Sequence, residues 1–411
     1  MATRLRLPLL DFPMLSASGL LLLIGLATVY SATTVPGAHE GLWIRQLTWL
    51  MLALGAAWVA ASLHYRAHDS LAYPLYGISL LLLVAVLAFG TSAFGAKRWL
   101  ELGPLRFQPS EIAKVATVFV LARRLSHPKL DLSRFRDWFP PLLLVLVPFA
   151  LVAEEPDLGT SLSFPAILIA MFYWAGMPAG TLILGLSPGF TLVLSFLLNP
   201  RELPFWLTLG LGLVVVIALV RPRRLLLVTA LLLNLGVAFA MPIVKDRLHD
   251  YQLRRIETFL NPDQDPHGAG YQIIQSRIAI GSGGLLGKGW LQGTQKGLSF
   301  LPMRHTDFIF AVVGEERGLL GALTVVILYG LIIVRGYRLA AVTRNGFASL
   351  LAVGLVTAFF YHVIVNILMT IGWAPVTGLP LPLLSYGGTA LVVNCIQLGL
   401  LQNVALRRQE Y

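Results

Sequence analysis

Charged residues are scarce in this chain of 411 residues. Asp, Glu, Lys and Arg together make up 12% of the sequence, whereas hydrophobic residues make up 56%. The mean hydropathy is accordingly high, at +0.75. A soluble core of this size cannot hide so many apolar side chains, so the composition excludes the soluble globular classes. It predicts an integral membrane protein with several membrane-spanning helices.

Cysteine is nearly absent as well. Cys395 is the only one, and it lies within the last apolar run of the sequence. A lone thiol can form neither a disulfide framework within the chain nor a thiolate metal cluster. We therefore expect no redox chemistry at cysteine and no thiolate-bound metal.

Nucleotide-binding motifs are also lacking, although one stretch is rich in glycine. A phosphate-binding loop ending at Gly287 and Lys288 would need glycine at Ser282, and a dinucleotide motif beginning at Gly281 would need glycine at Leu286. This pattern excludes ATP and NAD as ligands. The glycines indicate either tight turns with close backbone contacts or a cradle of N–H groups for an anion, and the residues leave both open.

Apolar runs long enough to cross a bilayer recur along the chain, and we interpret twelve of them as membrane-spanning helices. They lie at 15–31, 47–63, 71–90, 110–122, 138–153, 160–176, 178–198, 203–220, 225–243, 308–334, 347–371 and 390–405. The first follows Arg4 and Arg6 and lacks a convincing cleavage site, so we expect a retained helix. The predicted fold is an all-α polytopic membrane protein of about 12 transmembrane helices, forming a single membrane domain over 1–411.

Basic residues are distributed unevenly between the two sides that these helices define. With the N-terminus inside, the inner segments contain sixteen Lys and Arg, and the short outer loops contain five. Loops rich in Lys and Arg stay in the cytoplasm, so both termini are predicted to be cytoplasmic. The long segment 244–306, before the last three helices, is then extracytoplasmic. Since topology explains the excess of positive charge, nucleic acid is not expected as a partner.

Polar side chains of several types gather in and just after this outer loop. Carboxylates, amides and cations occur together there, as recognition of a sugar phosphate would require. A solvated loop without a ligand has the same composition, and the residues alone leave that alternative open. The residues are Asp263, Asp265, Gln272, Gln275, Arg277, Lys288, Gln295, Lys296, Arg304, His305 and Asp307.

A second polar stretch, GAKRWLELGPLRFQPSEIAK, occupies 95–114 and is also predicted to lie outside. Glu111 and Lys114 are three residues apart at the start of a helix, so they share a face and can pair. Ionisable groups at membrane depth are costly unless they serve a cavity, which favours a functional site over a purely structural pair. Trp99 in this stretch is either an interfacial anchor or a substrate contact.

Two further stretches interrupt the apolar runs. EEPDLGTS at 154–161 puts three acids at an outer membrane boundary, where Asp157 can cap a helix or serve a site. GLPLPLLSYGGTA at 378–390 is broken by proline and glycine. Such irregular backbone is tolerated at membrane depth only inside protein or along a cavity.

These stretches together resemble the SEDS family (shape, elongation, division and sporulation), whose members polymerise bacterial peptidoglycan strands. The resemblance runs through KRWLELGPLRFQPSEIAK, EPDLGTS, the long stretch from DPHGAGYQ to GEERGLLG, and MTIGWAPVTGLPLPLLSYGGTA, in that order and in both halves of the chain. Within the family, GSGGLLGKGWLQGTQ and PVTGLPLPLLSYGG look like the elongation branch rather than the division branch.

The resemblance implies a peptidoglycan glycosyltransferase that polymerises lipid II into β-1,4 glycan strands on the outer face of the cytoplasmic membrane, with release of undecaprenyl pyrophosphate. It makes Asp265, in the family's DPxGxGYQ motif, the catalytic residue, and Asp263 a dispensable neighbour. The side chains expected to contact substrate are Trp99, Glu111, Lys114, Asp157, Gln272, Gln275, Arg277, Lys288, Arg304, His305 and Ser385.

The same resemblance implies partners and a location. We expect lipid II and the growing strand, a class B penicillin-binding transpeptidase and other elongation-complex proteins as partners, in the bacterial cytoplasmic membrane. No nucleotide is needed, because the donor is already activated. A divalent cation (Mg²⁺ or Mn²⁺) would help to neutralise pyrophosphate, but no ligand cluster of recognisable spacing marks a metal site. Family members usually have ten membrane-spanning helices, two fewer than the twelve predicted here. We place the two additional helices between 177 and 243.

Three other functions fit parts of the sequence. A lipid II flippase would also use a cavity with Glu111 and Lys114, but transport needs ionisable groups through the full bilayer depth, and here most lie on the outer side. Another lipid-linked glycan polymerase or ligase would share the many spans and the outer loop, and only the four motif stretches argue against it. The third is a scaffold that activates a partner transpeptidase.

Overall fold

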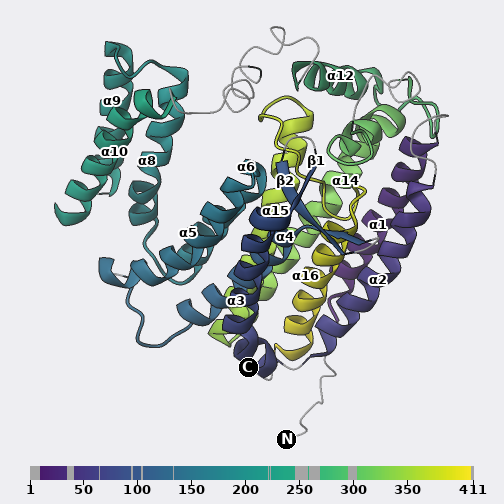
Figure 1. Ribbon diagram of the computed structural model, residues 1–411, viewed down its shortest axis with the longest axis horizontal. Coiled ribbons are helices and arrows are strands. Elements are labelled where there is room, and N and C mark those ends of the chain that lie inside the picture. Colours follow the sequence, from purple (N-terminus) through teal and green to yellow (C-terminus); the bar gives the residue numbers. More distant parts are fainter. Residues whose placement is uncertain are drawn as a thin grey trace, which may run out of the picture. The chain divides into compact units, whose positions relative to one another are not determined.

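Helices dominate the structure, a computed structural model that describes residues 10–34, 41–63, 65–93, 96–102, 105–132, 134–220, 222, 224–245, 258, 269–294 and 303–408 (Figure 1). The helices are α1 Phe12–Thr33, α2 Leu42–Ser62, α3 Tyr65–Phe89, α4 Pro109–Leu125, η1 Phe135–Trp138, α5 Phe139–Glu154, α6 Leu158–Ser161, α7 Ser163–Trp174, α8 Ala179–Leu197, α9 Leu203–Val220, α10 Arg224–Lys245, α12 Ala269–Ser282, α14 Ile309–Val342, α15 Gly346–Thr370 and α16 Gly388–Arg407. Each predicted apolar run coincides with one of these helices or with α6 and α7 together. The chain is an all-α polytopic membrane protein, as predicted.

Ten helices in the described part of the chain are long and apolar enough to cross a membrane. α4 is not among them, because it has 17 residues and includes the four charged side chains Glu111, Lys114, Arg123 and Arg124. The predicted span at 160–176 corresponds to a shorter apolar helical segment, Leu158–Trp174. The prediction of about twelve spans thus divides into ten apolar helices and two that are shorter or more polar.

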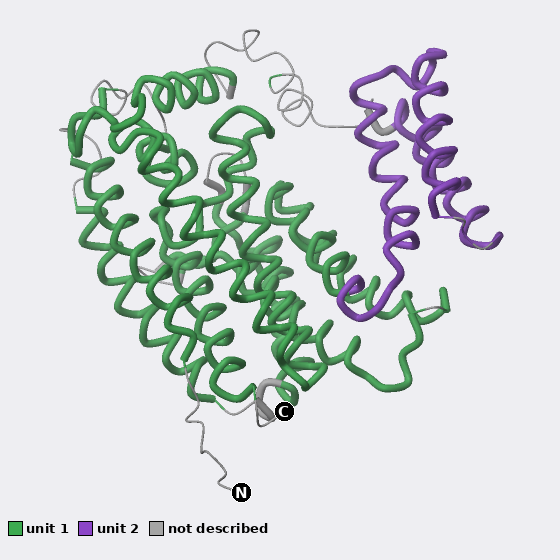
Figure 2. Tube along the Cα trace, turned by 180° about the vertical axis from the view of Figure 1, so that it is seen from behind, with its two compact units in different colours: residues 1–171, 258–411 green, residues 172–257 purple. Residues whose placement is uncertain are grey.

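The described residues group into two compact units, coloured green and purple in Figure 2. Unit 1 comprises residues 1–171 and 258–411, and unit 2 comprises 172–257. α8, α9 and α10 belong to unit 2 and fall where the sequence predicted surplus helices. The assignment of one membrane domain over 1–411 stays a prediction. Of the predicted loop 244–306, only α12, the turn that follows it and a few other residues are described.

Unit 2 holds a buried polar cluster between two of its helices. Asn234 of α10 donates through Nδ2 to the Ser187 hydroxyl of α8 at 2.7 Å, and Thr191 of α8 donates to Asn234 Oδ1. All three side chains are buried. Because the hydrocarbon core offers no water, polar groups there must pair within the protein, and these three pair across the α8–α10 contact.

In unit 1, α15 and α16 lie at the centre. In the most apolar 18 residues of each helix, 72% of α15 and 78% of α16 are buried, against 17% of α2. Two glycines allow the close packing around them. A Cβ atom at Gly354 of α15 would lie 2.4 Å from Cγ1 of Val118 on α4, and one at Gly399 of α16 would lie 2.3 Å from the carbonyl oxygen of Ala57 on α2. Small residues of this kind let membrane helices approach closely.

The last turn of α2 is completed by side chains of α16. Asn403 donates through Nδ2 to the carbonyl oxygens of Ala61 at 2.7 Å and Leu63 at 2.5 Å. Arg407 donates to the Ser62 carbonyl at 2.8 Å. The final carbonyl groups of a helix have no partner within the helix, so α16 supplies the donors that the end of α2 lacks.

A small antiparallel sheet precedes α4. It consists of β1 Thr91–Ala93, β2 Ala96–Leu102 and β3 Leu105–Phe107, in the order β1-β2-β3. Thr91 pairs with Trp99, and Leu100 pairs with Phe107. These strands were not predicted from the sequence, because two of them have only three residues and show no alternation of apolar and polar side chains. The sheet leads the chain directly into Pro109, the first residue of α4.

α14 is interrupted at Gly318, whose φ of 64° is not helical. The glycine-rich turn after α12 fills the interruption. Its Lys288 and Gly289 N–H groups donate to the carbonyls of Glu315 and Glu316 at 3.0 and 3.1 Å, and a Cβ at Gly287 would lie 2.2 Å from the Glu316 carbonyl oxygen. The glycines therefore serve close backbone contact, the first of the two alternatives that the sequence left open.

Candidate active site

The start of α4 buries the pair of charges that its spacing predicted. Lys114 Nζ donates to Glu111 Oε1 at 2.8 Å, and both side chains are 2% exposed. Lys114 also contacts Nε2 of His362, a buried residue of α15. Withdrawing two charges from water is costly even when they pair, so such a pair is weak evidence for a role in stability alone.

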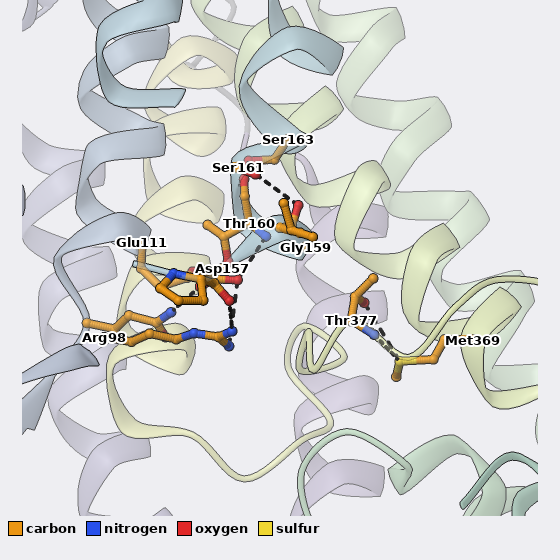
Figure 3. A network of polar contacts seen from close by, with 12 residues as sticks. Arg98, Glu111, Asp157, Gly159, Thr160, Ser161, Ser163, Met369 and Thr377 are labelled. Carbon is orange, nitrogen blue, oxygen red and sulfur yellow. Dashed lines mark hydrogen bonds and ion pairs between the residues drawn. The ribbon is translucent and has the colours of Figure 1, made fainter. Parts of the chain in front are cut away.

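Asp157 gathers donors from three parts of the chain (Figure 3). Its Oδ1 accepts from the Thr160 N–H at 3.2 Å, so it caps α6 as one predicted alternative required. Its Oδ2 accepts from Gln108 Nε2 at 3.0 Å, and Arg98 of β2 lies 3.8 Å from Oδ1. The guanidinium of Arg98 also donates to the Pro156 carbonyl. The cap is thus held by the polar stretch that precedes α4.

Glu155, the residue after the last one of α5, is buried without a partner. Its side chain has no exposed surface, and neither carboxyl oxygen has a hydrogen bond among the described residues. Burial, assisted by the neighbouring charge of Asp157 and opposed by that of Arg98, raises the pKa of Glu155 to about 8. Because burial disfavours the charged form, this carboxyl group is mostly protonated at neutral pH.

The irregular segment 378–388 is anchored by side chains that satisfy its backbone. Ser385 donates to the Thr306 carbonyl at 2.5 Å and accepts from the Leu381 N–H at 2.8 Å. Gln46 of α2 donates to the Ser385 carbonyl at 3.2 Å, and Tyr329 of α14 donates to the Pro382 carbonyl. The segment is buried inside protein, as irregular backbone between two membrane helices requires.

The four polar stretches converge on one side of α15. Three of its side chains, Tyr361, His362 and Asn366, reach all of them. The contacts join Tyr361 with the Gly159 carbonyl, His362 with Lys114 and Pro380, and Asn366 with the Asp307 and Leu379 carbonyls. Stretches that are far apart in sequence thus form one site, and the end of the outer loop belongs to it.

A family model for cell cycle proteins of the FtsW, RodA and SpoVE type matches residues 6–202 and 186–410, nearly the whole chain. The chain belongs to this family. It is the SEDS family, so the resemblance seen in the motifs is confirmed. The two matched segments overlap at 186–202, which lies within unit 2.

Relatives and solved structures match over almost their full length. Peptidoglycan glycosyltransferase MrdB of Escherichia coli strain K12 is 41% identical, with 95% of this chain and 93% of the relative covered. Probable peptidoglycan glycosyltransferase FtsW of Geobacter metallireducens is 33% identical, with 93% and 91% covered. A chain of a peptidoglycan synthase complex matches with a TM-score of 0.72 at 32% identity, covering 98% and 99%. RodA of Thermus thermophilus matches with a TM-score of 0.64 at 28% identity, covering 99% of both chains.

Other residues predicted for the SEDS site lie at its edge or are engaged elsewhere. Lys288 donates to Glu315 Oε1 at 2.8 Å and to the Thr294 hydroxyl at 2.7 Å, so it fastens the glycine-rich turn to α14. Arg304 is buried and donates through Nε to the Ala32 carbonyl at 2.9 Å. The ring of His305 lies 5.9 Å from that of Tyr386, beside the irregular segment.

The remaining predicted residues lie on α12, on β2 or outside the described residues. Gln272 and Gln275 are half-buried on α12, and Arg277 of the same helix is exposed. Trp99 is half-buried on β2. Asp263, Asp265, Gln295 and Lys296 fall outside the described residues, so their predicted roles stay predictions.

Four side chains of this site, those of Arg98, Glu155, His362 and Asn366, were not predicted from the sequence as members of it. Arg98 and Glu155 adjoin residues that were singled out, but only folding brings Arg98 to Asp157, from 59 positions away in the sequence. His362 and Asn366 lie within an apolar run and are four residues apart, on one helix face. That spacing of polar groups inside a membrane span is the signal that would have identified them.

Proposed function

We propose that this protein is a peptidoglycan glycosyltransferase of the elongation branch, which polymerises lipid II into β-1,4 glycan strands on the outer face of the cytoplasmic membrane. The observation that carries the proposal is the 41% identity to peptidoglycan glycosyltransferase MrdB across nearly the full length of both chains. The likeness to RodA supports the elongation branch, with cell elongation and rod shape as the process served.

The reaction joins two lipid-linked sugars. The C4 hydroxyl of an acceptor GlcNAc attacks the anomeric carbon of a MurNAc, and the new C–O bond forms as the bond to undecaprenyl pyrophosphate breaks, with inversion. The hydroxyl proton passes to a base, and the electron pair of the broken bond leaves with the pyrophosphate. The site therefore needs a base beside the acceptor and positive charge beside the leaving group.

Two residues are proposed for these two needs. Asp265, in the motif that matches the family, is the proposed base. Lys114 is the proposed cation for the pyrophosphate, because its buried ammonium retains one N–H without a partner among the described residues. Within these residues, no three His, Cys, Asp or Glu side chains are grouped closely enough to hold a metal ion. A Mg²⁺ or Mn²⁺ ion carried by the pyrophosphate itself stays a prediction.

The partner and the location follow from related observations. The chain is a multi-pass membrane protein. The match to a peptidoglycan synthase complex that coordinates polymerization and crosslinking supports a class B penicillin-binding transpeptidase as its partner. The excess of Lys and Arg in the inner segments supports cytoplasmic termini in a bacterial inner membrane.

The decisive experiment gives purified protein fluorescent lipid II in detergent, without any partner. The proposal expects glycan strands and release of undecaprenyl pyrophosphate from wild-type protein, and a rate about 10²- to 10⁴-fold lower from Asp265→Asn. Translocation of lipid II across liposomes without strand formation would instead identify a flippase. Strands made only from another lipid-linked glycan would identify a different polymerase. Strand formation that appears only with a transpeptidase that itself contains a polymerase domain would identify a scaffold.

A further inference from the structure

His362 is a buried imidazole between two of the site's motif stretches. It lies on α15, is 3% exposed, and contacts Lys114 of α4 through Nε2. Glu111 already neutralises Lys114, so the ion pair does not need the imidazole for charge balance. The ring of His362 also lies beside the backbone of Pro380 in the irregular segment.

These two contacts determine where the imidazole proton lies. An ammonium group only donates, so Nε2 must be the acceptor of the bond with Lys114. A proline has no backbone N–H, so Pro380 can only accept, through its carbonyl oxygen. Since Nε2 accepts from Lys114, the proton of the neutral ring is on Nδ1, the nitrogen left to donate to a carbonyl such as that of Pro380.

The same geometry fixes the direction of the third N–H bond of Lys114. A lysine ammonium has three donors on a flexible stem of four carbons. One donor meets Glu111 Oε1 at 2.8 Å and a second meets His362, from a different helix. With two donors held by two helices, the third has a defined direction, and it has no partner among the described residues.

We propose that His362 is a positioning residue, which aims the free N–H of Lys114 at the pyrophosphate of the donor substrate. The inference rests on the proposed function for the identity of that anion. It also gives the irregular segment a role, because Pro380 of that segment lies beside the same ring. Removing this support leaves Lys114 charged but free to turn, and poor positioning costs rate rather than binding.

The test compares His362→Leu with His362→Gln in the lipid II polymerisation assay. Leucine has neither an acceptor nor a donor, whereas the glutamine amide can accept from Lys114 and donate to Pro380. We expect His362→Leu to lower kcat by about 10²-fold with little change in KM, and His362→Gln to stay within about tenfold of wild type. Thr357→Val, a buried polar-to-apolar change on the same helix, is the matched control and should keep its rate.

Two outcomes would overturn the positioning role. Wild-type rates from a folded His362→Leu protein would show that Lys114 does not need the ring. A limb of the pH–rate profile that is present in wild type and absent from His362→Gln would show that the imidazole itself transfers a proton. The positioning role expects the same profile for both proteins, since glutamine does not titrate.

A measurement without substrate separates this inference from the proposed function. Thermal unfolding of Lys114→Met, His362→Leu and the double variant forms a double-mutant cycle. We expect the double variant to lose less in unfolding temperature than the two single losses together, and additive losses would overturn the contact that carries the inference. If wild-type protein makes no glycan strands, the proposed function fails, and the cycle still decides whether Lys114 and His362 are coupled.

Discussion

At the scale of single residues, the buried ionisable groups of the site are of two kinds, those paired with an opposite charge and one without a hydrogen bond in the described part of the chain. Lys114 and Glu111 neutralise each other, and Lys114 is held from a second side by His362. Glu155 has no hydrogen bond among the described residues, and burial raises its pKa to about 8. Burying a neutral carboxylic acid costs much less free energy than burying a carboxylate. Glu155 is therefore buried in its protonated form.

The raised pKa of Glu155 predicts a pH-dependent stability. Between its ordinary value of 4.5 and about 8, the folded state binds a proton that the unfolded state has lost. Folding stability from this group is therefore full below about pH 4.5, falls as the pH rises, and is lowest above about 8. We expect Glu155→Gln to unfold at a higher temperature relative to wild type at pH 9 than at pH 5, as measured by thermal unfolding in detergent. Parallel pH curves for the two proteins would contradict the shift.

The proposed base predicts a sharp difference between two neighbouring acids. Loss of a positioned base typically lowers the rate by about 10²- to 10⁴-fold, so we expect Asp265→Asn to lose that much lipid II polymerisation. Asp263→Ala, two residues away, should stay close to wild type. Both variants should be expressed and inserted normally, because both residues belong to the polar segment that the sequence predicts to lie outside the membrane. Equal damage at both positions would remove the distinction between them.

The pairing of Glu111 with Lys114 could be predicted because three residues along a helix bring two side chains to one face. The partners of Asp157 and Lys114 could not. Arg98 and His362 lie 59 and 248 positions from them, and only the packing of β2 and α15 against α4 and α6 brings them near. Contacts between residues so far apart leave no spacing pattern in the sequence from which they could be predicted.

At the scale of elements, the helices were predictable and the strands were not. Runs such as 203–220 and 347–371 are long and apolar, and the structure has α9 and α15 there. β1 and β3 have three residues each, too few to show the alternation of a strand. The interruption of α14 at Gly318 was also unforeseen, because the turn that fills it comes from about thirty positions earlier in the chain.

The polar cluster in unit 2 predicts how much an amide contributes between membrane helices. We expect Asn234→Leu to weaken the α8–α10 contact by about 0.6–2 kcal/mol, the range found for hydrogen bonds between such helices. Thr229→Val on α10 is the matched control, because Thr229 is half-buried and its hydroxyl donates to the Leu225 carbonyl of its own helix. Unfolding of the purified variants in a denaturing detergent measures the difference. An Asn234→Leu protein as stable as the control would show that the cluster adds nothing to the contact.

At the scale of the whole molecule, composition alone predicted the class, and the distribution of charge predicted the orientation. Twelve apolar runs and the excess of inner Lys and Arg require no contact information. The grouping into two units does require it, since nothing in the apolar runs at 178–198 or 203–220 distinguishes them from the helices of unit 1. The helices of unit 2 differ in what they contact, which hydropathy does not record.

The predicted orientation can be measured with cysteine labelling in a Cys395→Ser background. Gln292 is exposed on the turn after α12, and Arg224 is exposed at the start of α10. We expect Gln292→Cys to react with an impermeant maleimide in intact spheroplasts, and Arg224→Cys to react only after permeabilisation. Labelling of Arg224→Cys from outside would change the number of crossings before the Asp265 loop. That loop could then lie in the cytoplasm, where the polymerase reaction would be impossible.

The hydrogen bonds at the end of α2 join residues that are synthesised at very different times. Asn403 and Arg407 are synthesised about 340 residues after the carbonyls they satisfy at Ala61, Ser62 and Leu63. During synthesis, the carbonyls at the end of α2 therefore lack these donors until α16 has been made. A chain truncated before residue 403 therefore lacks the donors that α16 supplies to the carbonyls at the end of α2, in addition to the last turn of α16 itself.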